Sequence, residues 1–172
     1  MSTFVLIEKY TVGAGGASSV TLGSGGTIPQ TYTDLIIKGS TRSNRSAVFD
    51  GIYLQPNNAT TNLSYRYLEG NGASASSGSS TTGLFLGTSA GANATSNTFN
   101  NWETIIPNYT SSNYKSVSSD SGGETNGTTA YADLVAGLWS NTSAITSLVF
   151  YCSAGNSFVQ YSTFYLYGVL KA

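Results

Sequence analysis

The sequence predicts an all-β fold: an antiparallel β-sandwich, jelly-roll-like, with about nine or ten short strands. Three observations lead to this expectation. Short runs of β-branched and aromatic residues recur along the chain. Clusters of Gly, Asn, Ser and Pro separate these runs at intervals of roughly 10–15 residues, and no long stretch has a helical period. The 172 residues suit one domain, so we expect a single sandwich over 1–172.

The first half of the chain alternates strand-like runs with loops. Residues 1–12 are expected to form an N-terminal arm or a first strand, because TFVLIEKYTV alternates apolar side chains. The stretch VGAGGAS lacks the glycine spacing of a phosphate-binding loop and predicts a flexible loop. Residues 70–83, GNGASASSGSSTTG, contain no apolar side chain larger than Ala and predict a second flexible Gly/Ser loop. Strands are expected at 19–24, 32–42, 47–55 and 63–69.

The second half continues the pattern, with one ambiguous segment. Strands are expected at 84–88, 98–109, 113–120, 144–153 and 160–171, and a turn cluster at 121–129. In AYADLVAGLWS (130–140) the apolar residues fit either a helix or one face of a strand. Gly137 and the β-rich surroundings favour the strand.

The last strand has two apolar faces, although a solvent-facing strand should have one polar side. On one face lie Phe158, Phe164 and Leu166, which we expect to fill the core. On the other lie Tyr161, Tyr165 and Tyr167. These three tyrosines are expected either to meet a neighbouring subunit or to be covered by the second sheet.

The composition favours a surface built for contact. Serine, threonine, asparagine and glycine number 27, 22, 14 and 20, whereas charged residues make up only 9%, against about 25% in an average globular chain. The net charge is −1 and the seven basic residues are scattered, so we expect no nucleic-acid partner. No apolar run reaches the length of a membrane span, and the N-terminal residues lack the features of a signal peptide. We therefore expect a protein that is made in the cytoplasm and stays soluble or is assembled there.

The residue types argue against catalysis. The chain has no histidine, which excludes Ser-His-Asp and Cys-His devices and zinc sites of the Cys/His type. The single cysteine, Cys152, is expected to be a buried strand thiol. Sequence spacing does not pair any two of the eight carboxylates for glycoside hydrolysis. We expect no enzyme and no cofactor.

Two binding hypotheses remain. Asp120 and Glu124 flank a glycine-containing segment that could supply oxygen ligands to calcium, although an ordinary turn is favoured. Exposed aromatic residues beside amide and hydroxyl groups would suit carbohydrate, and the candidates are Tyr65, Arg66, Tyr67, Trp102 and Trp139. The favoured alternative is that these residues are core or interface anchors.

Five segments run in this order through most of the chain: IPQTYTDLIIKGSTRSN, NLSYRYLEGNG, IIPNYTSSNYKS, LVAGLWSNTSAITSL and FVQYSTFYLYGVLK. Together they resemble segments of virion structural proteins of tailed phages, especially marine ones. The closing element of that family, Ser-Thr-x-x-Leu-Tyr-Gly, is present as Ser162, Thr163, Leu166, Tyr167 and Gly168.

The resemblance implies a non-enzymatic β-sandwich located on the virion. Relatives of this kind resemble head decoration proteins or components of tails and fibres, and they bring no catalytic residues. We therefore expect a decoration or cement protein that binds the major capsid protein or other virion proteins, as a homotrimer. The alternative expectation is a tail or fibre module that recognises host surface glycans.

Overall fold

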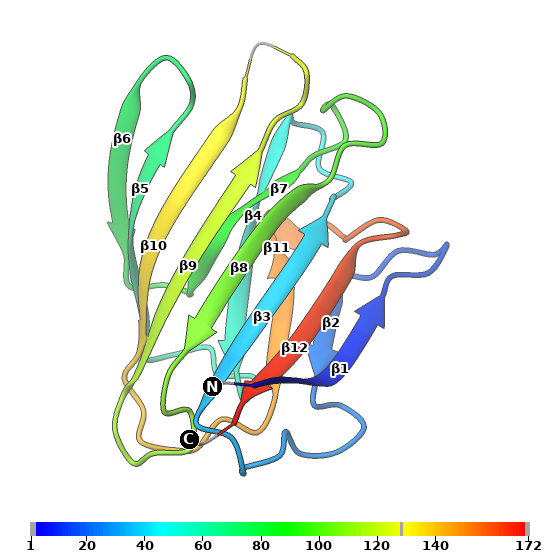
Figure 1. The fold of residues 1–172 in the computed structure, drawn as a ribbon. Helices are drawn as coiled ribbons and strands as arrows, with labels where there is room; N and C mark the ends of the chain where they lie inside the picture. Colours follow the sequence, from blue (N-terminus) through cyan, green and yellow to red (C-terminus); the bar gives the residue numbers. More distant parts are fainter. Residues whose placement is uncertain (1–2, 128, 171–172) are drawn as a thin grey trace.

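The computed structural model describes residues 3–127 and 129–170, and these form two antiparallel sheets packed face to face (Figure 1). This confirms the predicted all-β sandwich. The described residues form twelve strands, more than the nine or ten expected. In this part of the chain, no helix is long and apolar enough to cross a membrane.

The two sheets differ in width. The eight-stranded sheet contains, in spatial order, β1 (Phe4–Thr11), β12 (Thr163–Val169), β3 (Asp34–Thr41), β8 (Asn100–Ile106), β9 (Lys115–Gly123), β10 (Tyr131–Trp139), β5 (Leu63–Gly70) and β6 (Ala75–Ser80). The four-stranded sheet contains β2 (Ser19–Leu22), β11 (Leu148–Cys152), β4 (Phe49–Pro56) and β7 (Phe85–Ala90).

Eight of the strands pair as in a jelly roll. The antiparallel pairs are β2 with β11, β3 with β8, β4 with β7, and β5 with β6. Taken in chain order, the first of these eight strands pairs with the last, the second with the seventh, the third with the sixth and the fourth with the fifth. This is the pattern of one long hairpin rolled into two sheets, the arrangement of a jelly roll.

Two additions widen the larger sheet. The hairpin of β9 and β10 lies between β8 and β5, and β12 with β1 extends the sheet beyond β3. β7 is the last strand of the smaller sheet on this side, and it packs against β8, β9 and β10. The inserted hairpin therefore places β5 and β6 past the edge of the four-stranded sheet, where Figure 1 shows them at one end of the molecule.

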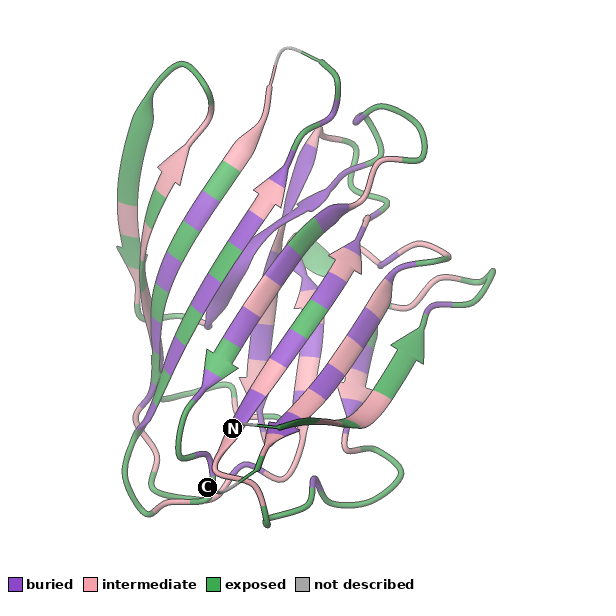
Figure 2. Ribbon diagram, in the orientation of Figure 1, coloured by how far each residue is buried: buried purple, intermediate pink, exposed green. Residues whose placement is uncertain are grey.

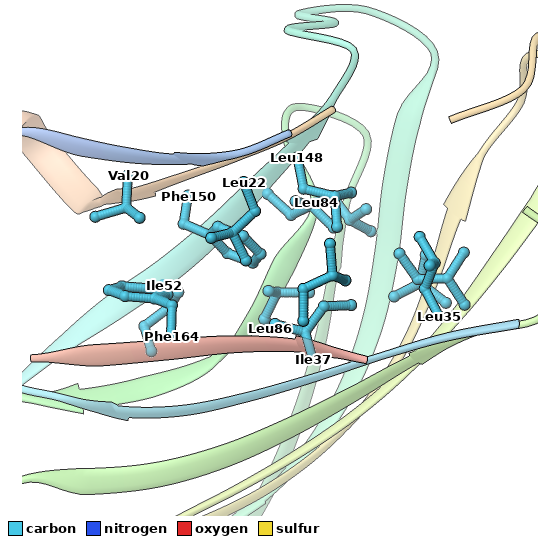
Figure 3. Close-up of a cluster of buried hydrophobic side chains, with 14 of the residues drawn as sticks. Val20, Leu22, Leu35, Ile37, Ile52, Leu84, Leu86, Leu148, Phe150 and Phe164 are labelled. Carbon is cyan, nitrogen blue, oxygen red and sulfur yellow. The ribbon is translucent and has the colours of Figure 1, made fainter. Parts of the chain in front are cut away.

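The core lies between the sheets and follows from the period of two along each strand. Buried and exposed residues alternate along β8, β9 and β10 in Figure 2. Aliphatic side chains from both sheets meet in the interior, as Figure 3 shows for Ile37 and Leu86. Phe150 and Phe164 pack across the sheets with ring centroids 5.4 Å apart. Each such side chain contributes about 1.5–3 kcal/mol on burial.

The expected Gly/Ser loop at 70–83 is wrong in its central part. Residues Ala75–Ser80 form β6, which pairs with β5 along its whole length. The segment cannot anchor itself in a core, but an edge strand needs only backbone hydrogen bonds on one side. Gly78 also makes room for Tyr67 of β5, because a Cβ there would come within 2.6 Å of the tyrosine ring.

Three other predicted segments can be compared with the structure. Of residues 1–12, Phe4–Thr11 form the edge strand β1, paired with β12, and residues 1 and 2 lie outside the described part of the chain. The ambiguous segment 130–140 contains strand β10, as predicted. The turn predicted from residue 121 is wrong at its start, because β9 continues to Gly123.

The two faces of the last strand have different surroundings. Phe164 and Leu166 are fully buried against the four-stranded sheet. Tyr165 and Tyr167 project from the opposite side, beyond which the described residues place no second layer. The expectation that the second sheet covers these two tyrosines is therefore wrong. Contact with a neighbouring subunit stays a prediction.

Candidate functional site

The aromatic cleft is a hollow of about 510 Å³ at the end of the sandwich where β5 and β6 extend past β7. Six aromatic residues line it, and this set defines the name: Phe49 and Tyr53 of β4, Tyr65 and Tyr67 of β5, Phe85 of β7 and Tyr131 of β10. The cleft thus follows from the inserted hairpin, which carries β5 away from β8 and sets its tyrosines opposite the smaller sheet.

The rings of the cleft support one another. Phe85 lies at the centre, with its ring centroid 5.6 Å from that of Tyr53, 5.5 Å from that of Tyr65 and 5.7 Å from that of Tyr67. Phe49 and Tyr131 form a second, edge-to-face pair at 4.5 Å. Such pairs add about 0.5–1.5 kcal/mol each beyond their burial. The rings are therefore held in place before any ligand arrives.

Glycine keeps the floor of the cleft open. Gly51 of β4 is among the lining residues, and a Cβ built on it would lie 3.0 Å from Cε2 of Tyr53 and 3.4 Å from Cε2 of Phe85. A side chain at Gly51 would therefore press against these two rings.

Charged groups stand beside the rings. Glu69 of β5 lines the cleft, and its Oε1 accepts a hydrogen bond from the Ser76 hydroxyl at 3.2 Å. Arg45 Nη1 donates to the Phe49 carbonyl at 3.2 Å and lies 3.8 Å from Oδ1 of the buried Asp50. The cleft therefore combines apolar ring surface with hydrogen-bond donors and acceptors.

Tyr53 and Tyr151 stay protonated at neutral pH. Burial, followed by the neighbouring Tyr65, raises the pKa of Tyr53 to about 12. Burial also raises the pKa of Tyr151, whose ring stacks on that of Tyr53 at 5.5 Å. A neutral phenol both donates and accepts hydrogen bonds.

The outer face is the side of the eight-stranded sheet that points away from the four-stranded sheet. It carries two groups of exposed apolar side chains. One group lies on β1 and contains Phe4 and Leu6; the other lies over the neighbouring strands β5 and β10 and contains Leu68, Leu134 and Leu138. Ile105 of β8 is exposed as well, with β12 and β3 between it and β1. Scattered apolar side chains are common on surfaces, but clusters on one flat sheet mark contact surfaces.

A small charged group separates the two apolar groups. Lys38 Nζ lies 2.5 Å from Oε2 of Glu103, and this carboxylate raises the pKa of Lys38. Asp120 is paired in register with Glu103 on the next strand. Burial and then Glu103 raise the pKa of Asp120. The middle of the outer face therefore contains one cation and two carboxyl groups, with Lys38 paired to Glu103.

The three predicted interface tyrosines are not equivalent. Tyr165 and Tyr167 stack on the outer face with ring centroids 6.4 Å apart, and Lys9 Nζ lies 5.3 Å from the Tyr165 ring. Tyr161 precedes β12 in a turn, with φ 74°, and its side chain is exposed. The alternation expected from residue 158 is wrong for Tyr161, because the chain turns before the strand begins.

The predicted glycan residues separate into three places. Tyr65 and Tyr67 lie together in the aromatic cleft. Arg66, between them, points to the other side of the sheet, as alternation requires. Trp102 is 3% exposed and donates from Nε1 to Thr41, so the favoured alternative, a core anchor, is confirmed for it and its candidate contact with a surface glycan is wrong. Trp139 is buried as well.

The predicted calcium ligands do not share a loop. Asp120 lies within β9 and Glu124 follows the end of that strand. Four residues of extended chain separate two positions by about 13 Å, too far for both carboxylates to hold one ion at 2.3–2.6 Å. Glu124 Oε1 instead accepts from the Asn126 amide at 2.7 Å. In the described part of the chain, no group of three or more His, Cys, Asp or Glu residues could hold a metal ion.

Sequence reasoning missed most of the aromatic cleft. It pointed to Tyr65 and Tyr67 but not to Tyr53, Phe85 or Glu69. The Tyr-x-Tyr-x-Glu alternation in β5 was the available signal, since it places these three side chains on one face. The residues that face these three across the cleft are placed there by the inserted hairpin of β9 and β10, and no local sequence pattern predicts that insertion.

Comparison of the chain with protein-family models, curated proteins and solved structures found no match.

Proposed function

We propose that this chain is a non-enzymatic structural protein of a tailed-phage virion that attaches to the capsid as a decoration or cement protein. The virion assignment rests on the resemblance of its segments to such proteins. The mechanism is stabilisation by mass action: a protein that binds only the assembled shell shifts the equilibrium away from disassembly.

The observation that carries the proposal is the outer face. Eight strands present one broad surface, with Phe4 and Leu6 at one end and Leu68 and Leu134 at the other. A partner that covers these side chains gains about 25 cal/mol per Å² of apolar surface. We infer that the major capsid protein is this partner and that the chain docks on it as a homotrimer.

The low charge of the surface supports the same role. Hydroxyl and amide groups supply most of its polarity, and only 9% of the residues are charged. Covering such a surface incurs a smaller desolvation penalty than covering a charged one. The Lys38–Glu103 pair supplies a polar point that would fix the orientation of the partner.

The test is a copy count on purified virions, by quantitative mass spectrometry against the major capsid protein. A ratio near one to one, or a simple lattice fraction of it, supports a decoration protein. A few copies per particle contradicts it and supports a tail or fibre position.

The aromatic cleft favours the second candidate, a tail or fibre module that recognises host surface glycans. Tyr65 and Tyr67 provide the ring surface that such a module needs. Its separate test is adsorption of the phage to host cells in the presence of the purified protein, which should compete for the receptor.

A further inference from the structure

We propose that the aromatic cleft binds a neutral saccharide, with the sugar ring against Tyr65 and Tyr67 and its hydroxyl groups hydrogen-bonded to Glu69. This inference rests on the second candidate function, glycan recognition, and deepens it: it names the class of sugar and the groups that hold it, and it applies whether the protein sits on the head or on the tail.

The size and shape of the cleft suit a small ligand. Its volume of about 510 Å³ lies within the range of ligand sites, about 300–1,000 Å³. Walls from β5 and β10 face β4 and β7, so a ligand would be contacted from two sheets. The glycine at position 51 leaves the floor free of a side chain that would fill it.

The rings match the apolar surface of a sugar. The C–H bonds of a pyranose carry small positive charges, and the face of a tyrosine ring is negative. Tyr65 and Tyr67 are partly exposed, whereas Phe85 behind them is 8% exposed. The two tyrosines therefore offer ring surface to a ligand, and Phe85 supports them from behind.

The polar groups match the hydroxyl groups of the same ligand. The Glu69 carboxylate has acceptor capacity beyond the one bond from Ser76. Hydrogen bonds from a hydroxyl to a carboxylate are stronger than those between neutral groups. The Arg45 guanidinium is a further donor on the lining. Alternating C–H and O–H groups are characteristic of carbohydrate, and the cleft presents partners for both.

The charge balance selects a neutral sugar. Glu69 and Asp50 line the cleft, against a single cation, Arg45. Arg45 already donates to the Phe49 carbonyl and lies near Asp50. A carboxylated sugar, a phosphate or a nucleic-acid backbone would meet net repulsion there.

The site is preorganised, which limits the entropy lost on binding. Tyr67 packs over Gly78 of β6 and against Phe85, with 5.7 Å between the ring centroids. Tyr65 packs against Tyr53 at 6.5 Å and against Phe85. Tyrosines fixed in this way bind with little loss of side-chain freedom.

The test is a glycan array of neutral and acidic saccharides probed with the purified full chain, followed by calorimetric titration of the strongest saccharide bound. The cleft variants are Tyr67→Ala and Glu69→Gln. The matched controls are Arg66→Ala, which alters the same strand on its other side, and Tyr165→Ala, which removes a tyrosine from the outer face. We expect a neutral saccharide to bind and each cleft variant to weaken it by roughly tenfold or more, with both controls unchanged.

Three results would overturn the inference: no saccharide bound by the wild-type chain, only acidic saccharides bound, or equal binding by the Glu69→Gln variant. Glu69→Gln keeps the shape of a partly exposed side chain, so its folding is not at risk even if Tyr67→Ala unfolds. If no saccharide binds, the copy count per virion can still support the decoration role. If the copy count is low, the saccharide titration can still support the cleft as a sugar site. The two proposals therefore fail separately.

Discussion

The indole of Trp102 occupies the space above Gly39 on the neighbouring strand. The two residues are paired in register between β8 and β3, and a Cβ built on Gly39 would lie 2.2 Å from Cε2 of Trp102. The missing side chain is what lets Trp102 lie inside the sandwich, donate to Thr41 and contact Phe164 at 5.8 Å between ring centroids.

Gly39→Ala should therefore destabilise the fold. The added methyl group forces the indole out of its position, and overpacking of this kind typically costs about 1–3 kcal/mol. Urea denaturation followed by tryptophan fluorescence measures the change. Gly25→Ala is the control, because nothing lies within 4 Å of its Cβ position, and its effect should stay within about 0.5 kcal/mol. Equal stability of the two variants would contradict the packing described for Trp102.

Strand β6 gives a second prediction, because a mobile loop and a paired strand differ in amide exchange. Backbone hydrogen bonds to β5 should slow exchange within Ala75–Ser80 relative to residues 13–15, which precede the bridge between Ala17 and Phe158. Hydrogen–deuterium exchange with mass spectrometry distinguishes the two. Gly78→Val should abolish the difference, because its side chain would collide with Tyr67. Uniformly fast exchange across 70–83 in the wild-type chain would contradict strand β6 and support the flexible loop expected from the sequence.

More of the fold than of the candidate site could be predicted from the sequence. Period-two runs and frequent turns were sufficient for the sandwich, since these signals are local. Strand β6 was not predicted because ASSGSS has no apolar face. This segment is a strand only because it pairs with β5. The aromatic cleft was not predicted for a different reason, because only the order of the strands brings Tyr67 and Phe85 together. For Trp102 the sequence left a core role and a glycan-binding role open, because aromatic residues are frequent both in cores and at binding sites.

Alkaline pH should weaken the fold through Tyr53. Its pKa rises from 10.0 to about 12 in the folded chain, so its contribution to stability is complete below pH 10 and is lost as the pH rises toward 12. Burial shifts Tyr109 and Tyr151 in the same direction. The lowered pKa of Lys115 acts oppositely, since the folded state favours its neutral form.

Tyr53→Phe should therefore lose less stability than the wild type over this pH range. Urea midpoints measured at several pH values between 9 and 12 give the two slopes. The control is Tyr161→Phe, which alters an exposed tyrosine. Identical slopes for the wild type and Tyr53→Phe would mean that Tyr53 ionises equally easily in the folded and unfolded chains.

Cys152 should be inert in the native protein. The side chain is 2% exposed, and burial raises the pKa of its thiol far above the usual range, with Asp50 adding to the effect. Reaction with a thiol reagent requires the thiolate and access to it. We expect modification only at the rate of unfolding, and full reaction in denaturant. Rapid labelling of the native chain by a coloured aromatic disulfide would contradict the buried position of Cys152.

Leu134→Glu tests the outer face directly. The side chain is 63% exposed on β10, between Leu68 of β5 and Asp120 of β9, so a carboxylate there should destabilise the isolated protein by no more than about 1 kcal/mol, through repulsion from Asp120. On a capsid, the same charge would be buried without a partner, and binding should fall by roughly a hundredfold or more. Sedimentation of the purified protein with capsids that lack it measures this loss. Tyr114→Glu is the control, because Tyr114 is 60% exposed in the loop before β9. If the Leu134 and Tyr114 variants both bind like the wild type, the chain does not dock through this part of the face.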